Sequence, residues 1–104
     1  MSDQEQWLKA RIVGKEAVAD DIVMFDLRPL DENMLEPYTP GAHLAVKVPN
    51  GETRKYSLCN GPDEAEGYVI AVKKEHGGRG GSVSLIDQTN VGDEILISAP
   101  RNDF

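Results

Sequence analysis

A cation, an aromatic ring and a hydroxyl stand close together in residues 54–60, which read Arg-Lys-Tyr-Ser-Leu-Cys-Asn. Because side chains alternate sides along a strand, we expect Arg54 and Tyr56 on one face and Lys55 and Ser57 on the other. A guanidinium can bind phosphate through paired hydrogen bonds, and a tyrosine ring offers a flat apolar surface. The segment therefore suits a ligand with an anionic end and a flat ring, although an ordinary half-buried strand that ends in a turn also fits.

A second candidate site lies downstream, where Gly77-Gly78-Arg79-Gly80-Gly81 is followed by Ser82. Glycines let backbone amides approach an anion closely, and a helix that starts here adds N–H groups and a favourable dipole. Ser82 is a good N-cap for a short helix of about two turns. The segment lacks the Gly-Lys-Ser or Gly-Lys-Thr end of a Walker loop and the βαβ setting of a Rossmann motif. It is a candidate phosphate cradle, or alternatively a flexible glycine hinge.

The two segments are more informative together than apart. Each supplies donors for a phosphate, and only the first supplies a surface for a ring. A mononucleotide with one flat ring system and one phosphate would satisfy both, and flavin mononucleotide (FMN) has that shape. This interpretation requires the fold to bring the two segments to one place.

The elements that must position these residues are short strand-like runs separated by Gly, Pro, Asn and Asp, which predict an all-β barrel or sandwich. The expected strands are Trp7–Val13, Ile22–Leu27, His43–Val48, Arg54–Asn60, Tyr68–Lys74 and Glu94–Ala99. Asn50-Gly51 predicts a hairpin turn, because both residues tolerate positive φ. A loop is expected over residues 29–41, with a type II turn at Pro40-Gly41.

Composition limits the possible functions. The 104 residues suit one domain, with 11 basic and 18 acidic side chains and a net charge of −7. This balance argues against nucleic-acid binding and against adhesion to anionic membranes. Cys59 is the single cysteine, which excludes an internal disulfide and a structural zinc or iron–sulfur site and fits a reducing, cytoplasmic setting. We expect Cys59 to be a small buried filler. No apolar run approaches the roughly 18 residues of a membrane span.

The motifs resemble those of the flavin-binding barrel of the ferredoxin–NADP reductase superfamily, in its phthalate dioxygenase reductase and vanillate demethylase reductase branch. The matching segments are Pro40–Leu44, Arg54–Asn60, Ile70–Lys73, Gly78–Ser82, Gly92-Asp93 and Pro100–Phe104. The resemblance covers nearly the whole chain from Leu8 onward. It implies that residues 1–104 form one domain, a six-stranded antiparallel Greek-key barrel with one short helix.

The resemblance also implies roles for individual residues. Arg54 would bind the flavin phosphate, Tyr56 would lie against the isoalloxazine ring, and Ser57 would sit near its reactive N5 atom as the catalytic residue. The other cofactor-binding residues would be Leu58, Cys59, Asn60, Val72 and Lys73 at the ring edge and ribityl chain, with Arg79, Gly80, Gly81 and Ser82 at the phosphate. No metal ligands are implied, and FMN is expected in preference to FAD.

The implied function is transfer of electrons from NADH through the flavin to an iron–sulfur centre. The expected partners are NAD-binding and ferredoxin-like domains and a terminal oxygenase. Because neither domain is present in these 104 residues, we expect the chain alone not to react with NADH. One alternative is a cofactor-free barrel that acts as a docking module. Another, an oligonucleotide-binding barrel, is disfavoured by the acidic charge and by an aromatic content of 6%.

Overall fold

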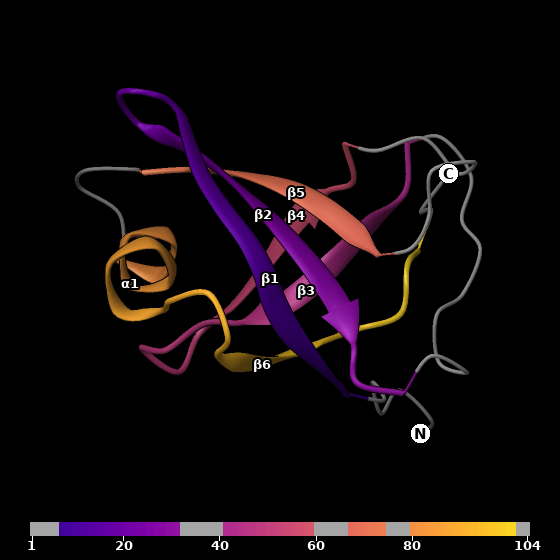
Figure 1. Cartoon of the computed structure of the whole chain (residues 1–104). Coiled ribbons are helices and arrows are strands. Elements are labelled where there is room, and N and C mark those ends of the chain that lie inside the picture. The colour runs from indigo at the N-terminus through magenta and orange to yellow at the C-terminus, as the bar shows by residue number, and fades with distance from the viewer. Residues whose placement is uncertain (1–6, 32–40, 60–66, 75–79, 102–104) are drawn as a thin grey trace.

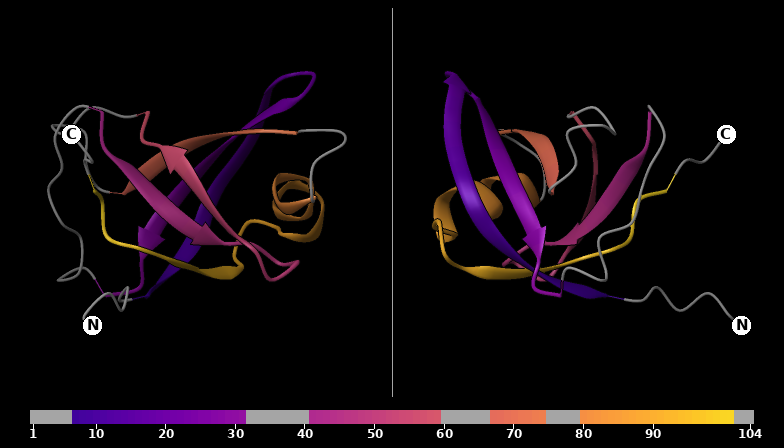
Figure 2. Two further views of the ribbon diagram at one scale, coloured as in Figure 1. Left: turned by 180° about the vertical axis from the view of Figure 1, so that it is seen from behind. Right: turned by 45° about the vertical axis from the view of Figure 1, so that its right-hand side comes forward.

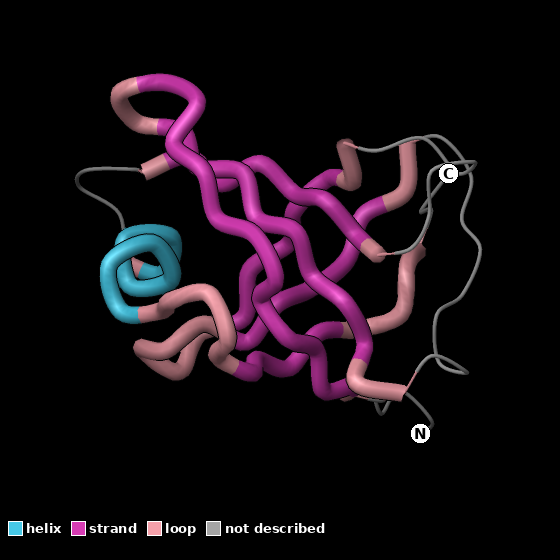
Figure 3. Tube along the Cα trace, in the orientation of Figure 1, coloured by secondary structure: helices cyan, strands magenta, loops and turns pink. Residues whose placement is uncertain are grey.

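The structure, a computed structural model, describes residues 7–31, 41–59, 67–74 and 80–101. Six strands and one helix make up these parts of the chain. They are β1 (Leu8–Ala19), β2 (Ile22–Pro29), β3 (His43–Lys47), β4 (Thr53–Ser57), β5 (Tyr68–Lys73), α1 (Gly81–Gln88) and β6 (Glu94–Ile97). The strands cross one another around a common interior, and α1 lies at one end of them (Figures 1 and 3).

The strands form one antiparallel sheet in the order β4-β3-β6-β1-β2-β5. The last strand, β6, lies between β3 and β1, so strands distant in sequence become neighbours, as in a Greek key. At the two ends of this order, β4 and β5 approach each other through one bridge, between Leu58 and Ile70. The six-stranded antiparallel barrel with one helix is therefore confirmed, but no continuous ladder joins β4 to β5.

The core explains the period of two in the strands. Alternate residues point inward, and β1, β2, β3, β5 and β6 each contribute buried apolar side chains, whereas β4 contributes the partly buried Tyr56. The inward residues include Ala10, Ile12, Phe25, Leu27, Leu44, Val46, Ile70, Val72 and Ile97, all at 0% exposure. Leu85, also at 0%, enters the same cluster from α1. The helix is therefore held against the end of the barrel by the burial of its apolar side.

The first strand is longer than its sequence pattern predicts. It continues past Val13 to Ala19 and pairs with β2 along its length, so the hairpin projects beyond the rest of the barrel (Figures 1 and 2). Residues 16–19 are exposed, and their side chains therefore carry no alternation of apolar and polar types. Asp20 and Asp21 form the turn between the two strands.

The predicted hairpin between β3 and β4 is confirmed, but its turn differs from the expected one. Gly51 has a φ of 93°, whereas no non-glycine residue in the described ranges has a positive φ. The Gly51 amide donates to the Val48 carbonyl at 2.9 Å, and the Val48 amide donates to the Glu52 carbonyl at 3.0 Å. Because Pro49 fixes a negative φ, it favours a type I turn followed by a left-handed glycine.

The helix begins two residues earlier than expected. Its N-cap is Gly80, with a φ of 81°, and no side chain caps it. Ser82, predicted as the N-cap, is instead the second helical residue and is 8% exposed. Glycine at the left-handed position leads the chain into the helix, which frees the Ser82 hydroxyl for another partner.

Candidate functional site

The fold brings the two segments singled out in the sequence to one place. The hydroxyls of Tyr56 on β4 and Ser82 on α1 lie 2.9 Å apart. The Arg54 side chain lies against Gly81, where an added Cβ atom would stand 2.6 Å from Arg54 Nε. Only glycine at position 81 therefore lets the guanidinium lie this close to the backbone at the start of the helix.

This junction has the features of an anion cradle, a name we keep for Arg54, Gly80, Gly81 and Ser82. The first amides of a helix have no intrahelical acceptor, and the helix dipole favours a negative charge there. The first turn of α1 holds no acidic residue that would neutralise this end. Arg54 Nη2 forms an ion pair with Glu52 Oε1 at 2.9 Å, which holds the guanidinium beside the helix.

A pocket of about 300 Å³ adjoins the cradle. It lies where β4 and β5, the two ends of the strand order, meet the start of α1. Its lining residues are Lys55, Tyr56, Ser57, Cys59, Ala71, Lys73 and Ser82. Two lysines, three hydroxyls and one aromatic ring thus surround a volume at the lower end of the range for small-molecule sites.

The remaining predicted site residues contribute in different ways. The amides of Leu58 and Cys59 donate to the carbonyls of Ala42 and Val69, at 3.0 and 2.8 Å. The Val72 side chain belongs to the core, so this residue can offer a ligand only its backbone. Asn60 and Arg79 lie outside the described residues, as do Gly77 and Gly78.

The expectation that Cys59 is a buried filler is wrong. Its side chain is exposed, and Sγ lies 3.9 Å from the Ser57 carbonyl oxygen. Cys59 follows β4, which is an edge strand of the sheet. In the described parts of the chain, no continuous ladder to another strand covers this edge. Cys59 therefore borders the pocket and takes no part in the core.

Sequence reasoning missed three residues at this site. Lys55 and Ala71 line the pocket, and Glu52 pairs with Arg54. Strand alternation placed Lys55 on the face opposite Tyr56. Because β4 is an edge strand of the sheet, residues from both of its faces can border one pocket. Glu52 was detectable, because it stands two positions from Arg54, directly before β4, and carries the opposite charge.

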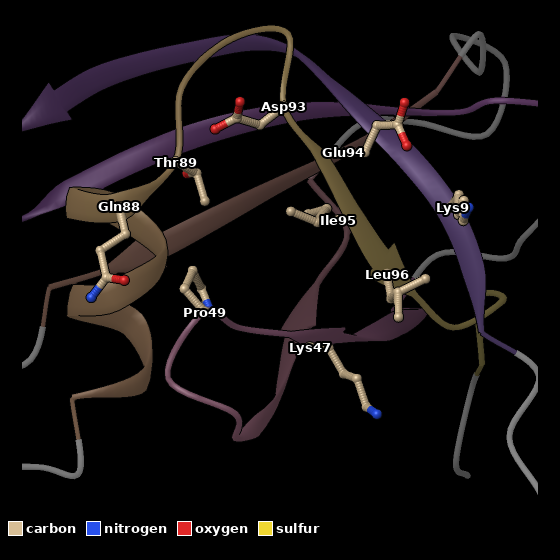
Figure 4. Close-up of a pocket in the computed structure, with 9 residues that line it drawn as sticks. All are labelled: Lys9, Lys47, Pro49, Gln88, Thr89, Asp93, Glu94, Ile95 and Leu96. Carbon is tan, nitrogen blue, oxygen red and sulfur yellow. The ribbon is translucent and has the colours of Figure 1, made fainter.

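A larger pocket, of about 540 Å³, lies between β3, β6, β1 and the end of α1 (Figure 4). None of the predicted site residues lines it. Two of its polar side chains serve the fold: the Asp93 carboxylate accepts from the Asn90 amide at 2.8 Å, and Thr89 Oγ1 donates to the Leu85 carbonyl at 2.5 Å. We therefore place the candidate site at the smaller pocket, where the first amides of α1 and several cations converge.

The residues at the smaller pocket fit a flavin that carries a phosphate. The anion cradle, where a Cβ atom on Gly81 would collide with Arg54, offers donors to a phosphate, and the half-buried Tyr56 beside it presents an aromatic surface. Within the described ranges there is no group of three or more His, Cys, Asp or Glu side chains that could hold a metal ion. The described helix is also too short and polar to cross a membrane.

Comparison with known proteins identifies the family of this chain. Residues 9–104 match the family described as oxidoreductase FAD-binding domain. Phthalate dioxygenase reductase from Burkholderia cepacia is 48% identical over 101 residues, which are 97% of this chain and 31% of that protein. Vanillate O-demethylase oxidoreductase from Pseudomonas putida is 43% identical over 97 residues, 93% of this chain and 30% of that protein.

Solved structures give the same result. A structure of phthalate dioxygenase reductase superimposes with a TM-score of 0.89 at 49% identity, over 94% of this chain and 30% of that one. A self-sufficient type IV cytochrome P450 monooxygenase contains a similar domain, with a TM-score of 0.86 at 30% identity, over 92% of this chain and 12% of that one. This chain thus spans about a third of the length of the curated relatives named here. It belongs to the oxidoreductase FAD-binding domain family, as a flavin-binding domain of the phthalate dioxygenase reductase branch.

Proposed function

We propose that this domain binds FMN and carries electrons from NADH to an iron–sulfur centre of an oxygenase system. The observation that carries the proposal is the meeting of Arg54 with Gly81 and of Tyr56 with Ser82, because it unites a phosphate cradle with an aromatic surface. The similar phthalate dioxygenase reductase is described as a modular structure for electron transfer from pyridine nucleotides to [2Fe-2S].

In this proposal the chain's own residues bind and orient the cofactor. Arg54 and Arg79 hold the phosphate together with the amides of Gly80, Gly81 and Ser82, and Tyr56 lies against the ring. The ring edge and ribityl chain are held by backbone groups of Leu58, Cys59, Asn60, Val72 and Lys73. Ser57 ends β4 with an exposed hydroxyl that borders the pocket, from which it can donate or accept a hydrogen bond at the flavin N5.

A bound flavin supplies the redox chemistry, accepting a hydride and releasing single electrons. The protein supplies the position of the ring and the groups around it. We propose that an NAD-binding domain, a ferredoxin-like domain and a terminal oxygenase complete the system. Relatives of the phthalate dioxygenase reductase branch are about three times as long as this chain, which leaves room for such domains in them.

The choice of FMN over FAD is part of the proposal. It is supported by the single cradle, which suits one terminal phosphate, whereas the name of the family points to FAD. The test is a titration of the purified chain with FMN, FAD and riboflavin, followed by quenching of flavin fluorescence. We expect FMN to bind tighter than FAD, and riboflavin, which has no phosphate, to bind weakest.

Equal affinity for FMN and riboflavin would contradict the phosphate cradle. Tighter binding of FAD than of FMN would correct the cofactor and retain the flavin site. If no flavin binds, either to this chain or to the chain joined to the NAD-binding domain of phthalate dioxygenase reductase, the docking-module alternative holds. The second preparation is needed because a neighbouring domain can cover part of a cofactor.

A further inference from the structure

An acidic side chain stands beside the cradle in a place where an anion is expected to bind. Glu52 precedes β4 and pairs with Arg54 at 2.9 Å, and the side chains of Glu52 and Arg54 are 26% and 37% exposed. The same Arg54 side chain lies against Gly81 at the start of α1. The Glu52 carboxylate is therefore linked through one guanidinium to the position proposed for the phosphate.

The turn that carries Glu52 is fixed against the helix. The Asn50 amide lies 3.4 Å from the Ser84 hydroxyl, and the Asn50 side-chain oxygen accepts from the Glu52 amide at 3.1 Å. Asn50 Nδ2 also stands 3.9 Å from the position of a Cβ atom on Gly80. Because these contacts join the hairpin turn to the first turn of α1, the carboxylate is held at the edge of the cradle.

We propose that Glu52 determines how strongly the cradle discriminates between flavins by the charge of their phosphate. This inference rests on the proposed flavin site. The carboxylate orients Arg54 through the ion pair, and it also repels an anion that binds the same guanidinium. Repulsion grows with the charge of the anion. A terminal phosphate carries close to two negative charges above pH 7, whereas each phosphate of a diphosphate diester carries one.

Other charges at the site do not remove this effect. Among the residues that the structure describes, the cations at the anion cradle and the adjoining pocket are Arg54, Lys55 and Lys73. Among the described residues, Glu52 is the acidic side chain that pairs directly with Arg54 of the anion cradle. A neutral side chain of the same shape at position 52 would therefore make the cradle more positive and still offer Arg54 an oxygen acceptor.

The test uses Glu52→Gln, with Glu94→Gln as the matched control. Glu94 also pairs with an arginine, Arg11, at 3.2 Å, and the loss of its charge changes the net charge equally, on another part of the barrel. Dissociation constants for FMN, FAD and riboflavin are measured at pH 8 and low salt. We expect Glu52→Gln to bind FMN roughly tenfold tighter and FAD roughly threefold tighter, since charge repulsion scales with the product of the charges.

Riboflavin binding should be unchanged by Glu52→Gln, and Glu94→Gln should change none of the three. The gain for FMN should shrink in high salt, because salt screens exposed charges. Unchanged or weaker FMN binding by Glu52→Gln, or an equal change for FMN and riboflavin, would overturn the inference. If the unaltered chain itself binds FMN no tighter than riboflavin, the proposed phosphate site has failed, and the inference fails with it.

Discussion

At the scale of single residues, Ser57 is the group that we place nearest the reacting atom. In our proposal, replacing Ser57 by Ala removes one hydrogen bond at the flavin N5, and a net hydrogen bond is worth about 0.5–1.5 kcal/mol. We expect hydride transfer from NADH to slow by roughly two- to tenfold in the chain joined to an NAD-binding domain. Stopped-flow flavin reduction measures this rate. Ser57→Thr keeps the hydroxyl and should restore it, and an unchanged rate in Ser57→Ala would remove Ser57 from the mechanism.

Gly81 allows a second test at this scale, because its effects on binding and on stability differ. A Cβ atom there would displace the flexible Arg54 side chain, whose Nε would otherwise be 2.6 Å away. Gly81→Ala should weaken FMN binding by roughly tenfold, as expected for a lost charge-assisted hydrogen bond, and affect riboflavin much less. Its free energy of unfolding should stay within about 1 kcal/mol, because alanine favours a helix. Equal weakening for both flavins would show that Gly81 acts on the fold instead of on the phosphate.

At the scale of elements, α1 is anchored at its C-terminal end by a side chain from β1. Lys15 Nζ donates to the carbonyls of Ile86 and Thr89, the latter at 2.5 Å, and lies 5.7 Å from the centre of the Phe25 ring. The helix has no basic residue of its own in its last turn, so this lysine supplies the cation that the C-terminal end of the helix dipole favours.

Lys15→Met should therefore destabilise the domain by roughly 1–3 kcal/mol, because hydrogen bonds to a charged donor are lost at carbonyls that remain half-buried. Urea denaturation measures the change. Lys9→Met is the control, since Lys9 is an exposed residue of the same strand, and it should change the free energy of unfolding by less than about 0.5 kcal/mol. Equal losses in the two variants would contradict the anchoring role of Lys15.

The elements themselves were largely predictable, and their ends were not. Strands with one buried face have a period of two that identifies them, as in Leu44, Val46 and Val48. The exposed half of β1 has no such period, because it is held by pairing with β2 and not by burial. The helix start was misplaced because a glycine N-cap in a left-handed conformation has no side-chain signal of its own.

At the scale of the whole molecule, the candidate site depends on contacts between distant parts of the chain. Alternation predicted that Arg54 and Tyr56 share a face, and the glycines predicted a place for an anion. That Tyr56 meets Ser82, 26 positions away, follows from the packing of α1 against the end of the barrel, which no local pattern specifies. The pairing of Glu52 with Arg54 was local and could have been recognised from their spacing and charges.

The central claim is that Arg54 and the start of α1 hold the same phosphate while Tyr56 faces the ring. The most direct measurement is a crystal structure of the domain soaked with FMN. We predict phosphate oxygens within hydrogen-bonding distance of both the Arg54 guanidinium and the amides of Gly81 and Ser82, with the isoalloxazine ring in the pocket beside Tyr56. A flavin bound in the pocket between β3, β6 and β1, or a phosphate that contacts only one of the two anchors, would contradict the claim.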